Sequence, residues 1–378
     1  MFRFLFIAAQ NQVISGGSEL LWSRVAVALA AQGHLVVASV PPGGSLPGDA
    51  SKGVRVCARR QMPTGVPARL LSKLSRASLD TRMASFQAVI RETKPDLIII
   101  NQPGFTEGFD CAELASKLSI PYVLLVHNIH RWAWLPPHFA QRVADAYGTS
   151  QRIDLLSDNA EQDLADVLNQ TFERVTRFRN PYGVDYELSS AFPALDAEVY
   201  IAMVGRLDPQ QKGHDLALRL LAHSSWRVRR VIFNVYGDGD YLGFLQKMSV
   251  RLGVADKVVF HGHVNDVPSI WAHNHALLMP SRYEGLPIAM VEAMLSARPV
   301  IATDVGGISE WIDDGENGFL IPAPTQELVA MTLEAAWARR GDWQLLGERA
   351  RVTALGLTAA DPVAEYAAGL CALAKSNR

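Results

Sequence analysis

Short apolar runs alternate with longer amphipathic stretches along the first half of the chain. Runs of Val, Ile and Leu bounded by polar loops are typical of strands buried on both faces of a parallel sheet. Apolar residues that recur every three or four positions predict amphipathic helices between these strands. We expect strands at 2–8, 35–40, 97–101, 122–126, 153–157 and 175–179, and helices at 18–31, 68–93 and 109–118.

The same alternation restarts after a break at residues 186–197. This break is small, polar and contains proline, which is typical of a linker. Strand–helix–strand repetition on both sides implies parallel sheets with right-handed crossovers. We therefore predict an α/β protein with two Rossmann-like, doubly wound domains, 1–185 and 198–361, that face a cleft, and a helical segment 362–378 that packs back on the first domain. The expected strands of the second domain are 199–204, 231–236, 258–260, 276–279 and 300–303.

Length and composition agree with two globular domains. The chain has 378 residues, of which 49% are hydrophobic and 20% charged, and its net charge is −2. This charge gives no general affinity for nucleic acid, so no nucleic-acid partner is expected. The cysteines Cys57, Cys111 and Cys371 show neither disulfide nor metal spacing, and reduced cytoplasmic thiols are the simplest interpretation.

Two features bear on membranes. The apolar run after Met1 is only about six residues long, so we interpret it as a first strand and not as a signal peptide. The region Arg59–Lys94 holds eight basic residues against Asp80 and Glu92. A solvated helical face explains this excess, and a patch that contacts anionic lipid or an anionic acceptor is the alternative. We expect a cytoplasmic protein that is at most peripheral on the inner membrane face.

Candidate chemistry concentrates between Ser281 and Gly307. A strand end is followed by a loop with Glu284, and then by a helix that begins near Pro287 and holds Glu292. Helix N-termini attract anions because unpaired N–H groups point outward there. A carboxylate only accepts hydrogen bonds and therefore suits the vicinal hydroxyls of a sugar or a ribose. An ordinary surface helix with scattered glutamates is the alternative explanation of the pair.

Other strand ends carry glycines beside polar residues. Arg206 and Lys212 follow the strand 199–204, and two fixed cations with glycine neighbours suit a diphosphate, although a solvated loop has the same composition. The loop Gly237–Gly239 is a weak phosphate signal because the rest of a dinucleotide fingerprint is absent. Residues 261–264 follow a further strand and are expected to flank a nucleobase.

Taken together, these loops resemble the family-four retaining glycosyltransferases of the GT-B fold, the glycosyl group 1 enzymes. The pattern of two glutamates separated by seven residues is present as Glu284 and Glu292. The resemblance extends over nearly the whole chain and is strongest from Val199 to Gly318. Its other motifs are Gly16-Gly17-Ser18-Glu19, Asn180-Pro181-Tyr182-Gly183-Val184-Asp185, Gly205-Arg206 with Lys212-Gly213, and Gly237-Asp238-Gly239.

The resemblance implies roles for single residues. Arg206 and Lys212 would neutralise the diphosphate of a nucleotide-sugar donor, and Glu292 would bind its ribose. Glu284 would hold the sugar together with two backbone N–H groups. The donor-binding residues are Gly16, Gly17, Gly205, Gly237, Asp238, Gly239, Val264, Ser281, Gly285, Leu286, Pro287 and Glu292, and the catalytic residues are Arg206, Lys212, Glu284 and His127.

His127 and the two N-terminal glycines belong to the first domain. The resemblance implies that Gly16 and Gly17 approach the diphosphate from that side, and that His127 contacts the sugar near the reacting carbon. A structural histidine at the end of a buried strand is the alternative for His127. Glycines alone would indicate only a turn before a helix.

The implied activity is transfer of a sugar from a nucleoside-diphosphate donor to an acceptor hydroxyl, with retention of configuration, in bacterial polysaccharide, lipopolysaccharide or glycolipid synthesis. No cofactor or metal is expected, because the two cations and a helix dipole suffice for the phosphates and no Asp-x-Asp motif accompanies them. The histidines of the second domain lie on different elements, so no zinc site is predicted.

The acceptor is expected to be a glycan or a lipid-linked molecule. The segment His127–Leu135 is aromatic and basic, and its Trp132 and Trp134 suit a sugar ring or a lipid tail, with core packing as the alternative. A sugar-nucleotide epimerase and a non-catalytic sugar-nucleotide-binding protein are the alternative functions. A dehydrogenase is disfavoured because the first strand–helix turn lacks the Gly-x-Gly-x-x-Gly fingerprint.

Overall fold

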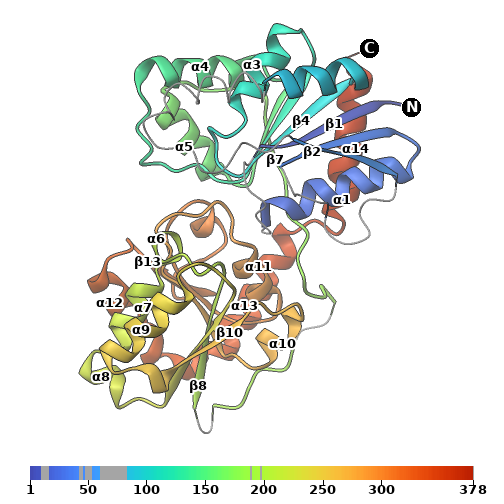
Figure 1. Ribbon diagram of the computed structural model, residues 1–378. Helices are drawn as coiled ribbons and strands as arrows, with labels where there is room; N and C mark the ends of the chain where they lie inside the picture. The colour runs from blue at the N-terminus through green and yellow to red at the C-terminus, as the bar shows by residue number, and fades with distance from the viewer. Residues whose placement is uncertain are drawn as a thin grey trace. The chain divides into compact units, whose positions relative to one another are not determined.

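The protein divides into two compact units, Met1–Pro181 with Ala359–Arg378, and Tyr182–Thr358. Each unit holds one parallel β-sheet surrounded by helices (Figure 1). The predicted α/β class with two Rossmann-like domains is confirmed. The computed structural model describes residues 1–9, 17–41, 46, 53–59, 83–187, 190–195 and 198–377.

The sheet of the first unit has the strand order β3-β2-β1-β4-β5-β6-β7. Continuous apolar runs form its middle, and every residue of β4 and β5 is buried. The chain builds outward from β1 in one direction and from β4 in the other, so the topological switch point lies between these two strands. The strands are β1 Arg3–Ala8, β2 Leu35–Val40, β3 Val54–Ala58, β4 Leu97–Gln102, β5 Tyr122–Val126, β6 Arg152–Leu155 and β7 Val175–Arg177.

The last helix of the chain returns to the first unit and packs beside its first helix (Figure 1). Tyr366 fixes it to the sheet, because its hydroxyl donates a 2.5 Å hydrogen bond to Asp154 on β6. The Arg152 guanidinium lies 5.4 Å from the centre of the same ring. The helices of this unit are α1 Gly17–Ala31, α3 Phe109–Lys117, α4 Pro137–Gly148, α5 Asp158–Leu168 and α14 Pro362–Ser376.

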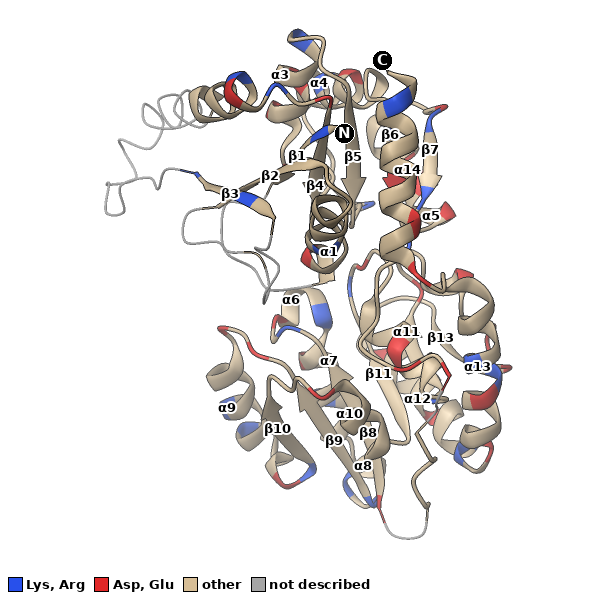
Figure 2. Cartoon of the chain, turned by 90° about the vertical axis from the view of Figure 1, so that its right-hand side faces the viewer, with Lys and Arg blue, Asp and Glu red and all other residues tan. Residues whose placement is uncertain are grey.

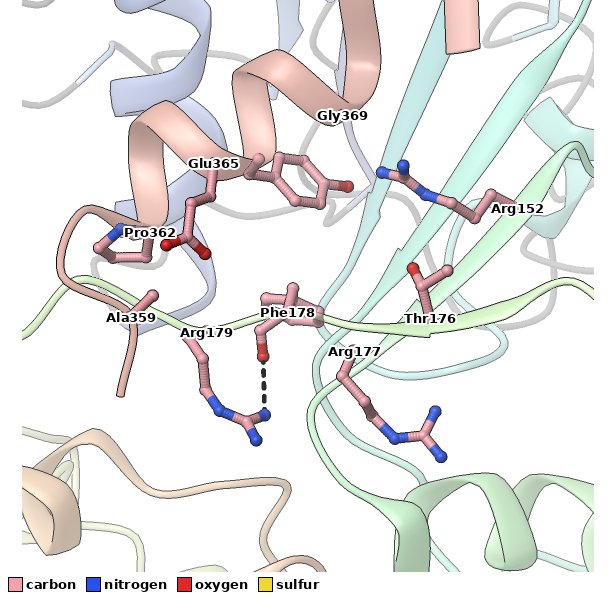
Figure 3. A pocket seen from close by; sticks show the side chains of 10 residues that line it. Arg152, Thr176, Arg177, Phe178, Arg179, Ala359, Pro362, Glu365 and Gly369 are labelled. Atoms are coloured by element: carbon pink, nitrogen blue, oxygen red, sulfur yellow. Dashed lines mark hydrogen bonds between the residues drawn. The ribbon is translucent and has the colours of Figure 1, made fainter. Parts of the chain in front are cut away.

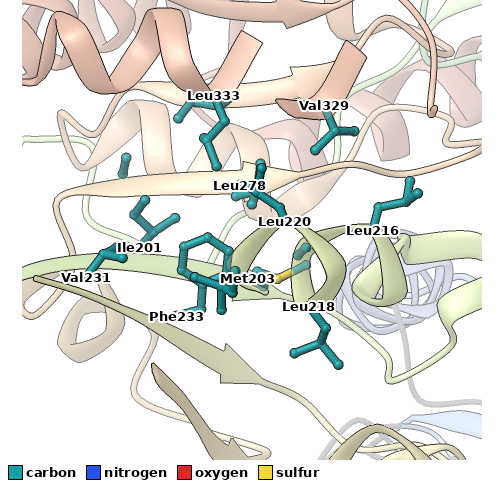
Figure 4. Packing of buried hydrophobic residues seen from close by; sticks show 14 of the residues in the cluster. Ile201, Met203, Leu216, Leu218, Leu220, Val231, Phe233, Leu278, Val329 and Leu333 are labelled. Carbon is teal, nitrogen blue, oxygen red and sulfur yellow. The ribbon is translucent and has the colours of Figure 1, made fainter. Parts of the chain in front are cut away.

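The sheet of the second unit has the order β10-β9-β8-β11-β12-β13, with its switch point between β8 and β11. Strands β8, β9 and β11 carry no charged residue and are uniformly tan in Figure 2. Figure 4 shows their side chains Ile201, Phe233 and Leu278 in the core with Leu220 and Leu333 from two helices. The strands are β8 Val199–Val204, β9 Val231–Tyr236, β10 Val258–Gly262, β11 Ala276–Met279, β12 Val300–Thr303 and β13 Gly318–Ile321.

Short helices fill the connections of the second unit, and the longest ones lie near its end. No helix in the described part of the chain combines the length and the apolar character that crossing a membrane requires. The helices are α6 Pro209–Lys212, α7 His214–Leu221, α8 Ser224–Arg227, α9 Leu242–Leu252, α10 Val267–Ala272, α11 Ile288–Leu295, α12 Gln326–Ala338 and α13 Trp343–Leu357.

Two edge strands are absent from the sequence prediction. β3 is mostly exposed and alternates apolar with polar residues, and β13 begins with a glycine and is followed at once by Pro322, so neither has the pattern of a buried strand. The first residue of β13 is Gly318. A larger residue does not fit there, because a Cβ would lie 2.6 Å from the Val300 carbonyl oxygen. The predicted helix 68–93 is helical from 83 to 93, and its residues 68–82 lie outside the described residues.

The segment predicted as a linker is bound to the second unit along its described part. Arg298 is fully buried and donates hydrogen bonds to the carbonyl oxygens of Ser190 and Ala191, at 3.3 and 2.6 Å. The same guanidinium also donates to carbonyl oxygens of Trp271 and of other residues in its own unit. Because its partners are neutral carbonyls, burial lowers the pKa of Arg298 to about 10.

Replacing Arg298 with Met is expected to destabilise the second unit by about 3 kcal/mol, because several buried carbonyl oxygens lose their donor. Calorimetric unfolding measures the loss. Arg251→Met, which changes an exposed arginine on α9 of the same unit, is the control and should unfold like the wild type. Equal stability of the two variants would contradict the anchoring role of Arg298.

Candidate functional site

The switch point of the second unit brings two loops together. The chain leaves β8 toward β9 and later leaves β11 toward β12, on the opposite side of the sheet. Loops that diverge in this way open a crevice at the carboxyl ends of the strands, where α/β sheets bind their ligands. Gly205 and Arg206 follow β8, and Pro280 and Ser281 follow β11.

An ion pair joins these two loops. Lys212 Nζ lies 2.6 Å from Glu284 Oε1, and the two side chains are 18% and 6% exposed. Lys212 ends the short helix α6, whose start is capped by Asp208, which accepts a hydrogen bond from the Gln210 N–H. The structure therefore brings a predicted cation and a predicted carboxylate into direct contact.

Glycines allow the close backbone contacts beneath this pair. Gly237 has φ +127°, and a Cβ there would lie 2.0 Å from the Gly205 carbonyl oxygen. A Cβ on Gly239 would lie 2.8 Å from the Leu207 carbonyl oxygen. The Leu207 N–H donates to the Asp238 carbonyl oxygen at 2.9 Å. The loop after β9 therefore supports the loop after β8 through backbone contacts that a side chain would block.

The Glu284 loop rests on a second pair of glycines. Gly306 has φ +57°, and a Cβ there would lie 2.3 Å from the Glu284 carbonyl oxygen. The Gly307 N–H donates to the Gly285 carbonyl oxygen at 2.8 Å. Leu286 is buried and Pro287 is the residue before the first turn of α11. This contact fixes the backbone whose N–H groups are expected to hold a ligand.

Ser281 is buried next to this loop. Within the described protein its hydroxyl has no hydrogen-bond partner. Buried hydroxyls normally have one, so an unsatisfied group beside a predicted binding loop is consistent with a ligand contact.

Glu292 lies inside α11 with a buried side chain. Its Oε1 accepts a 2.8 Å hydrogen bond from the Gly183 N–H. Burial raises the pKa of Glu292 to about 7, and the hydrogen bond from Gly183 acts in the opposite direction. Because a Cβ on Gly183 would lie only 3.0 Å from Oε1, the glycine lets the Asn180–Asp185 motif approach this carboxylate.

Arg206 is exposed, and its Nη2 lies 3.4 Å from Gln211 Oε1. The neighbouring Arg282 was not among the predicted site residues. Two of its nitrogens donate to the Asp215 carboxylate, both at 2.9 Å. Arg282 also donates to the Pro209 carbonyl oxygen at 2.5 Å, at the start of α6. We interpret Arg282 as a residue that holds α6, and only its place next to Ser281 in the sequence could have indicated this.

The loops after β9 and β10 hold the remaining predicted residues. Asp238 is exposed, Val264 is half-buried, and a Cβ on Gly262 would lie 3.5 Å from Asp238 Oδ1. His261 stacks on Tyr236 with ring centres 4.5 Å apart. Within the described ranges, no three His, Cys, Asp or Glu side chains gather in a way that would hold a metal ion.

In the first unit, His127 follows β5 and is buried. Its Nε2 lies 2.7 Å from Asn101 Oδ1, and its ring packs edge-to-face on Phe178. Burial lowers the pKa of His127 to about 3, so its imidazole is neutral at physiological pH. Gly17 is the first residue of α1, and Gly16 lies outside the described residues.

The two surfaces that were predicted to contact an acceptor or a membrane differ in how exposed their side chains are. Trp132 and Trp134 are 68% and 91% exposed, so core packing is excluded for both. Arg59, in contrast, is buried, and it donates to the Ala8 carbonyl oxygen at 2.6 Å. Its inclusion in an exposed basic surface was therefore wrong, because the Phe86 ring and a backbone acceptor hold its side chain inside. Arg91 and Lys94 are exposed, and the other five basic residues of the region lie outside the described residues.

A cavity of about 270 Å³ in the first unit lies between β7 and α14 and contains no predicted donor residue (Figure 3). Its arginines already have partners. Arg152 binds Asp154 at 2.6 Å, and Arg177 binds Asp158 and Glu161 at 2.6 and 2.5 Å. Arg179 donates to the carbonyl oxygens of Leu156 and Phe178, at 2.9 and 3.2 Å. Since carboxylates neutralise Arg152 and Arg177 and backbone carbonyls hold Arg179, we do not assign the diphosphate to this cavity.

Two family models match the chain. The model described as glycosyl transferases group 1 matches residues 198–337, in the second unit. The model described as glycosyl transferase 4-like domain matches residues 16–167, in the first unit. The two matches together cover more than three quarters of the chain.

Similar proteins include two that are named as sugar transferases. The chain is 26% identical to the alpha-D-kanosaminyltransferase of Streptomyces kanamyceticus, over 54% of this chain and 58% of that one. It is 28% identical to a GDP-mannose-dependent alpha-(1-6)-phosphatidylinositol monomannoside mannosyltransferase of Mycolicibacterium smegmatis, over 57% of this chain and 53% of that one. The chain thus spans little more than half the length of these curated relatives.

Solved structures share the fold over the whole chain. HepE from Anabaena in complex with UDP superposes with a TM-score of 0.73 at 19% identity, covering 99% of this chain and 100% of that one. At 19% identity, this similarity shows that the two proteins share a fold.

Replacing Glu292 with Gln is expected to stabilise the ligand-free protein at about pH 8 by on the order of 3 kcal/mol. The folded-state pKa of about 7 lies above the ordinary 4.5, so the wild type loses stability as the pH rises between these values. Gln keeps an oxygen for Gly183 and removes the buried charge. Melting curves at about pH 8 and pH 5 measure the effect. A stability difference that is the same at both pH values would contradict the raised pKa.

Proposed function

Because this chain belongs to the group 1 glycosyltransferases, we propose that it transfers a sugar from a nucleoside-diphosphate donor to an acceptor hydroxyl. The observation that carries the proposal is the ion pair of Lys212 and Glu284 at the switch point of the second unit. A cation for phosphate oxygens and a carboxylate for sugar hydroxyls, held together at the end of a parallel sheet, are the groups that such a donor requires.

The two members of the ion pair exchange partners when the donor binds. In the free protein Glu284 neutralises Lys212. A diphosphate brings a larger negative charge to Lys212 and to the exposed Arg206, and it displaces the carboxylate from the lysine. Glu284 then accepts hydrogen bonds from sugar hydroxyls. Glu292 binds the ribose. In the ligand-free protein, its Oε1 accepts a hydrogen bond from the Gly183 N–H.

Cleavage of the donor leaves negative charge on the β-phosphate. Lys212, Arg206 and the N-terminus of α11 stabilise this charge, and each such preorganised donor lowers the barrier by about 3 kcal/mol. These groups supply the neutralising charge, so the proposed reaction is independent of a metal ion and of a cofactor.

The configuration of the sugar is retained because the acceptor attacks on the face from which the diphosphate leaves. The bond from the anomeric carbon to the diphosphate oxygen breaks while the bond to the acceptor oxygen forms. The electron pair of the broken bond stays on the β-phosphate, which takes the proton of the acceptor hydroxyl. Retaining glycosidases use a carboxylate nucleophile instead. The sequence motifs of the family support this part of the proposal.

The acceptor is a glycan or a lipid-linked molecule, met at the inner face of a bacterial membrane during polysaccharide, lipopolysaccharide or glycolipid synthesis. The exposed Trp132 and Trp134 support this choice, since indole rings stack on sugars and settle at lipid–water boundaries. The Arg131 guanidinium lies 5.5 Å from the centre of the Trp132 ring and pairs with the Asp163 carboxylate at 3.5 Å, so it contributes to the position of the ring.

The alternative functions are separated by one screen. Thermal shifts with a panel of nucleotide sugars identify the base and the sugar, and nucleoside-diphosphate release is then measured with and without acceptor pools. Release that depends on an acceptor supports transfer. A changed sugar without acceptor would indicate an epimerase, and binding without turnover would indicate a non-catalytic binding protein.

Replacing Arg206 with Ala is expected to lower kcat/KM for the donor by about 100-fold to 1,000-fold, because a phosphate contact is lost in the transition state. Glu292→Ala should raise the KM for the donor. Arg219→Ala, which changes an exposed arginine of α7 in the same unit, is the matched control. Unchanged turnover in both site variants would refute the donor-site assignment.

Vesicle flotation tests the membrane contact. The wild type is expected to float with vesicles that contain anionic lipid, and the double variant Trp132→Ala and Trp134→Ala should float less, because two interfacial side chains are lost. Phe244→Ala, at an exposed apolar residue of the second unit, is the control. A wild type that floats with neither anionic nor neutral vesicles would remove the membrane contact from the proposal.

A further inference from the structure

A chain of hydrogen bonds connects His127 to the beginning of α1. His127 Nε2 lies 2.7 Å from Asn101 Oδ1 on β4. Asn101 Nδ2 donates to Glu19 Oε1 at 3.2 Å, and the Trp22 indole N–H donates to Glu19 Oε2 at 2.7 Å. Asn101 is fully buried near the end of β4, after four apolar residues. Its amide therefore has few partners besides these two side chains.

The chemistry of the three groups sets the direction of every bond. A carboxylate only accepts hydrogen bonds, so the donor side of the Asn101 amide must face Glu19. An inverted amide would place its oxygen against a negative oxygen. The Asn101 oxygen consequently faces His127 and requires a donor there. The proton of the imidazole must then lie on Nε2.

His127 has only one ring proton to place. Its burial favours the neutral imidazole, which carries a proton on one nitrogen only. With that proton on Nε2, the other nitrogen, Nδ1, is left with a lone pair. Nδ1 makes no hydrogen bond within the described protein. The edge-to-face contact with Phe178, at 5.2 Å between ring centres, holds the plane of the ring.

We propose that Glu19 and Asn101 are positioning residues that hold His127 as its Nε2–H tautomer, so that Nδ1 accepts a hydrogen bond from a hydroxyl of the donor sugar. The sugar contact rests on the proposed glycosyltransferase function, whereas the tautomer does not. The assignment gives a role to the last residue of the Gly16–Glu19 motif, beyond that of its glycines. It also makes His127 an orienting acceptor and not a proton donor to the leaving group.

A conservative substitution is expected to reverse the tautomer. In Glu19→Gln, the new amide oxygen accepts from Trp22 and its NH₂ group donates toward Asn101. The Asn101 oxygen then turns to Gln and its NH₂ group turns to His127. Nε2 must accept in that arrangement, and the ring proton moves to Nδ1. Glu113→Gln, at a surface glutamate that pairs with Arg142, is the matched control.

Nitrogen NMR of ¹⁵N-histidine-labelled protein reads the tautomer directly, with His127→Gln to identify the signal. We expect a protonated Nε2 and an unprotonated Nδ1 in the wild type and in Glu113→Gln, and the reverse in Glu19→Gln. A protonated Nδ1 in the wild type, or an unchanged tautomer in Glu19→Gln, would overturn the inference. The wild-type spectrum tests the predicted tautomer of His127 even if the variant fails to fold.

The sugar contact has its own readout. With the donor found in the nucleotide-sugar screen, Glu19→Gln should lower kcat/KM by about tenfold to 100-fold, because the nitrogen that faces the hydroxyl has become a donor. A reversed tautomer with unchanged kcat/KM would overturn the role of Nδ1. If neither the wild type nor any variant releases nucleoside diphosphate, the proposed function is refuted. The tautomer of the wild type would still test the chain of hydrogen bonds from Glu19 to His127.

Discussion

The ion pair of Lys212 and Glu284 depends on how closely two loops of the second unit can approach. Gly213 follows Lys212 with φ +68°, and a Cβ there would lie 2.0 Å from the Pro280 carbonyl oxygen. Gly205 leaves room for the lysine stem, since a Cβ on it would lie 3.2 Å from Lys212 Cε. The glycines of this unit thus place a cation where β8 and β11 diverge, and the charge of the site follows from backbone geometry.

Two buried polar side chains connect the segment after Tyr182 to the body of the second unit. Glu292 holds Gly183, and Arg298 holds Ser190 and Ala191, so the segment after Tyr182 lies on the unit that contains the candidate donor site. Neither buried group has an oppositely charged partner in these contacts, and both therefore have shifted pKa values. Such arrangements cost stability, and they are common at functional sites.

Sequence patterns predicted the central strands of the second unit well because these strands are largely apolar. The predicted and observed ends agree for β8, β9, β11 and β12. The edge strands β3 and β13 were missed, because β3 alternates apolar with polar residues and β13 begins with a glycine and is followed by Pro322. The group 1 glycosyltransferase family was also predicted correctly, since its motifs are local in sequence.

Contacts between distant residues were beyond the reach of those patterns. Lys212, Glu284 and Glu292 were predicted from the sequence. The ion pair of the first two and the contact of Glu292 with Gly183 depend on tertiary packing. Asn101 was not selected, because one polar residue at the end of an apolar run indicates only a strand end. Its position between Glu19 and His127 becomes visible once β4 and α1 are packed together.

The most direct test compares the affinity of a nucleoside diphosphate with that of the matching monophosphate, using the base found in the nucleotide-sugar screen. If Lys212 holds the β-phosphate, the wild type binds the diphosphate at least about tenfold more tightly, as expected for a charged hydrogen bond. Lys212→Met should then bind the two nucleotides with similar affinity. A variant that keeps the wild-type ratio would contradict the account, because the ion-pair lysine would not be the residue that receives the diphosphate.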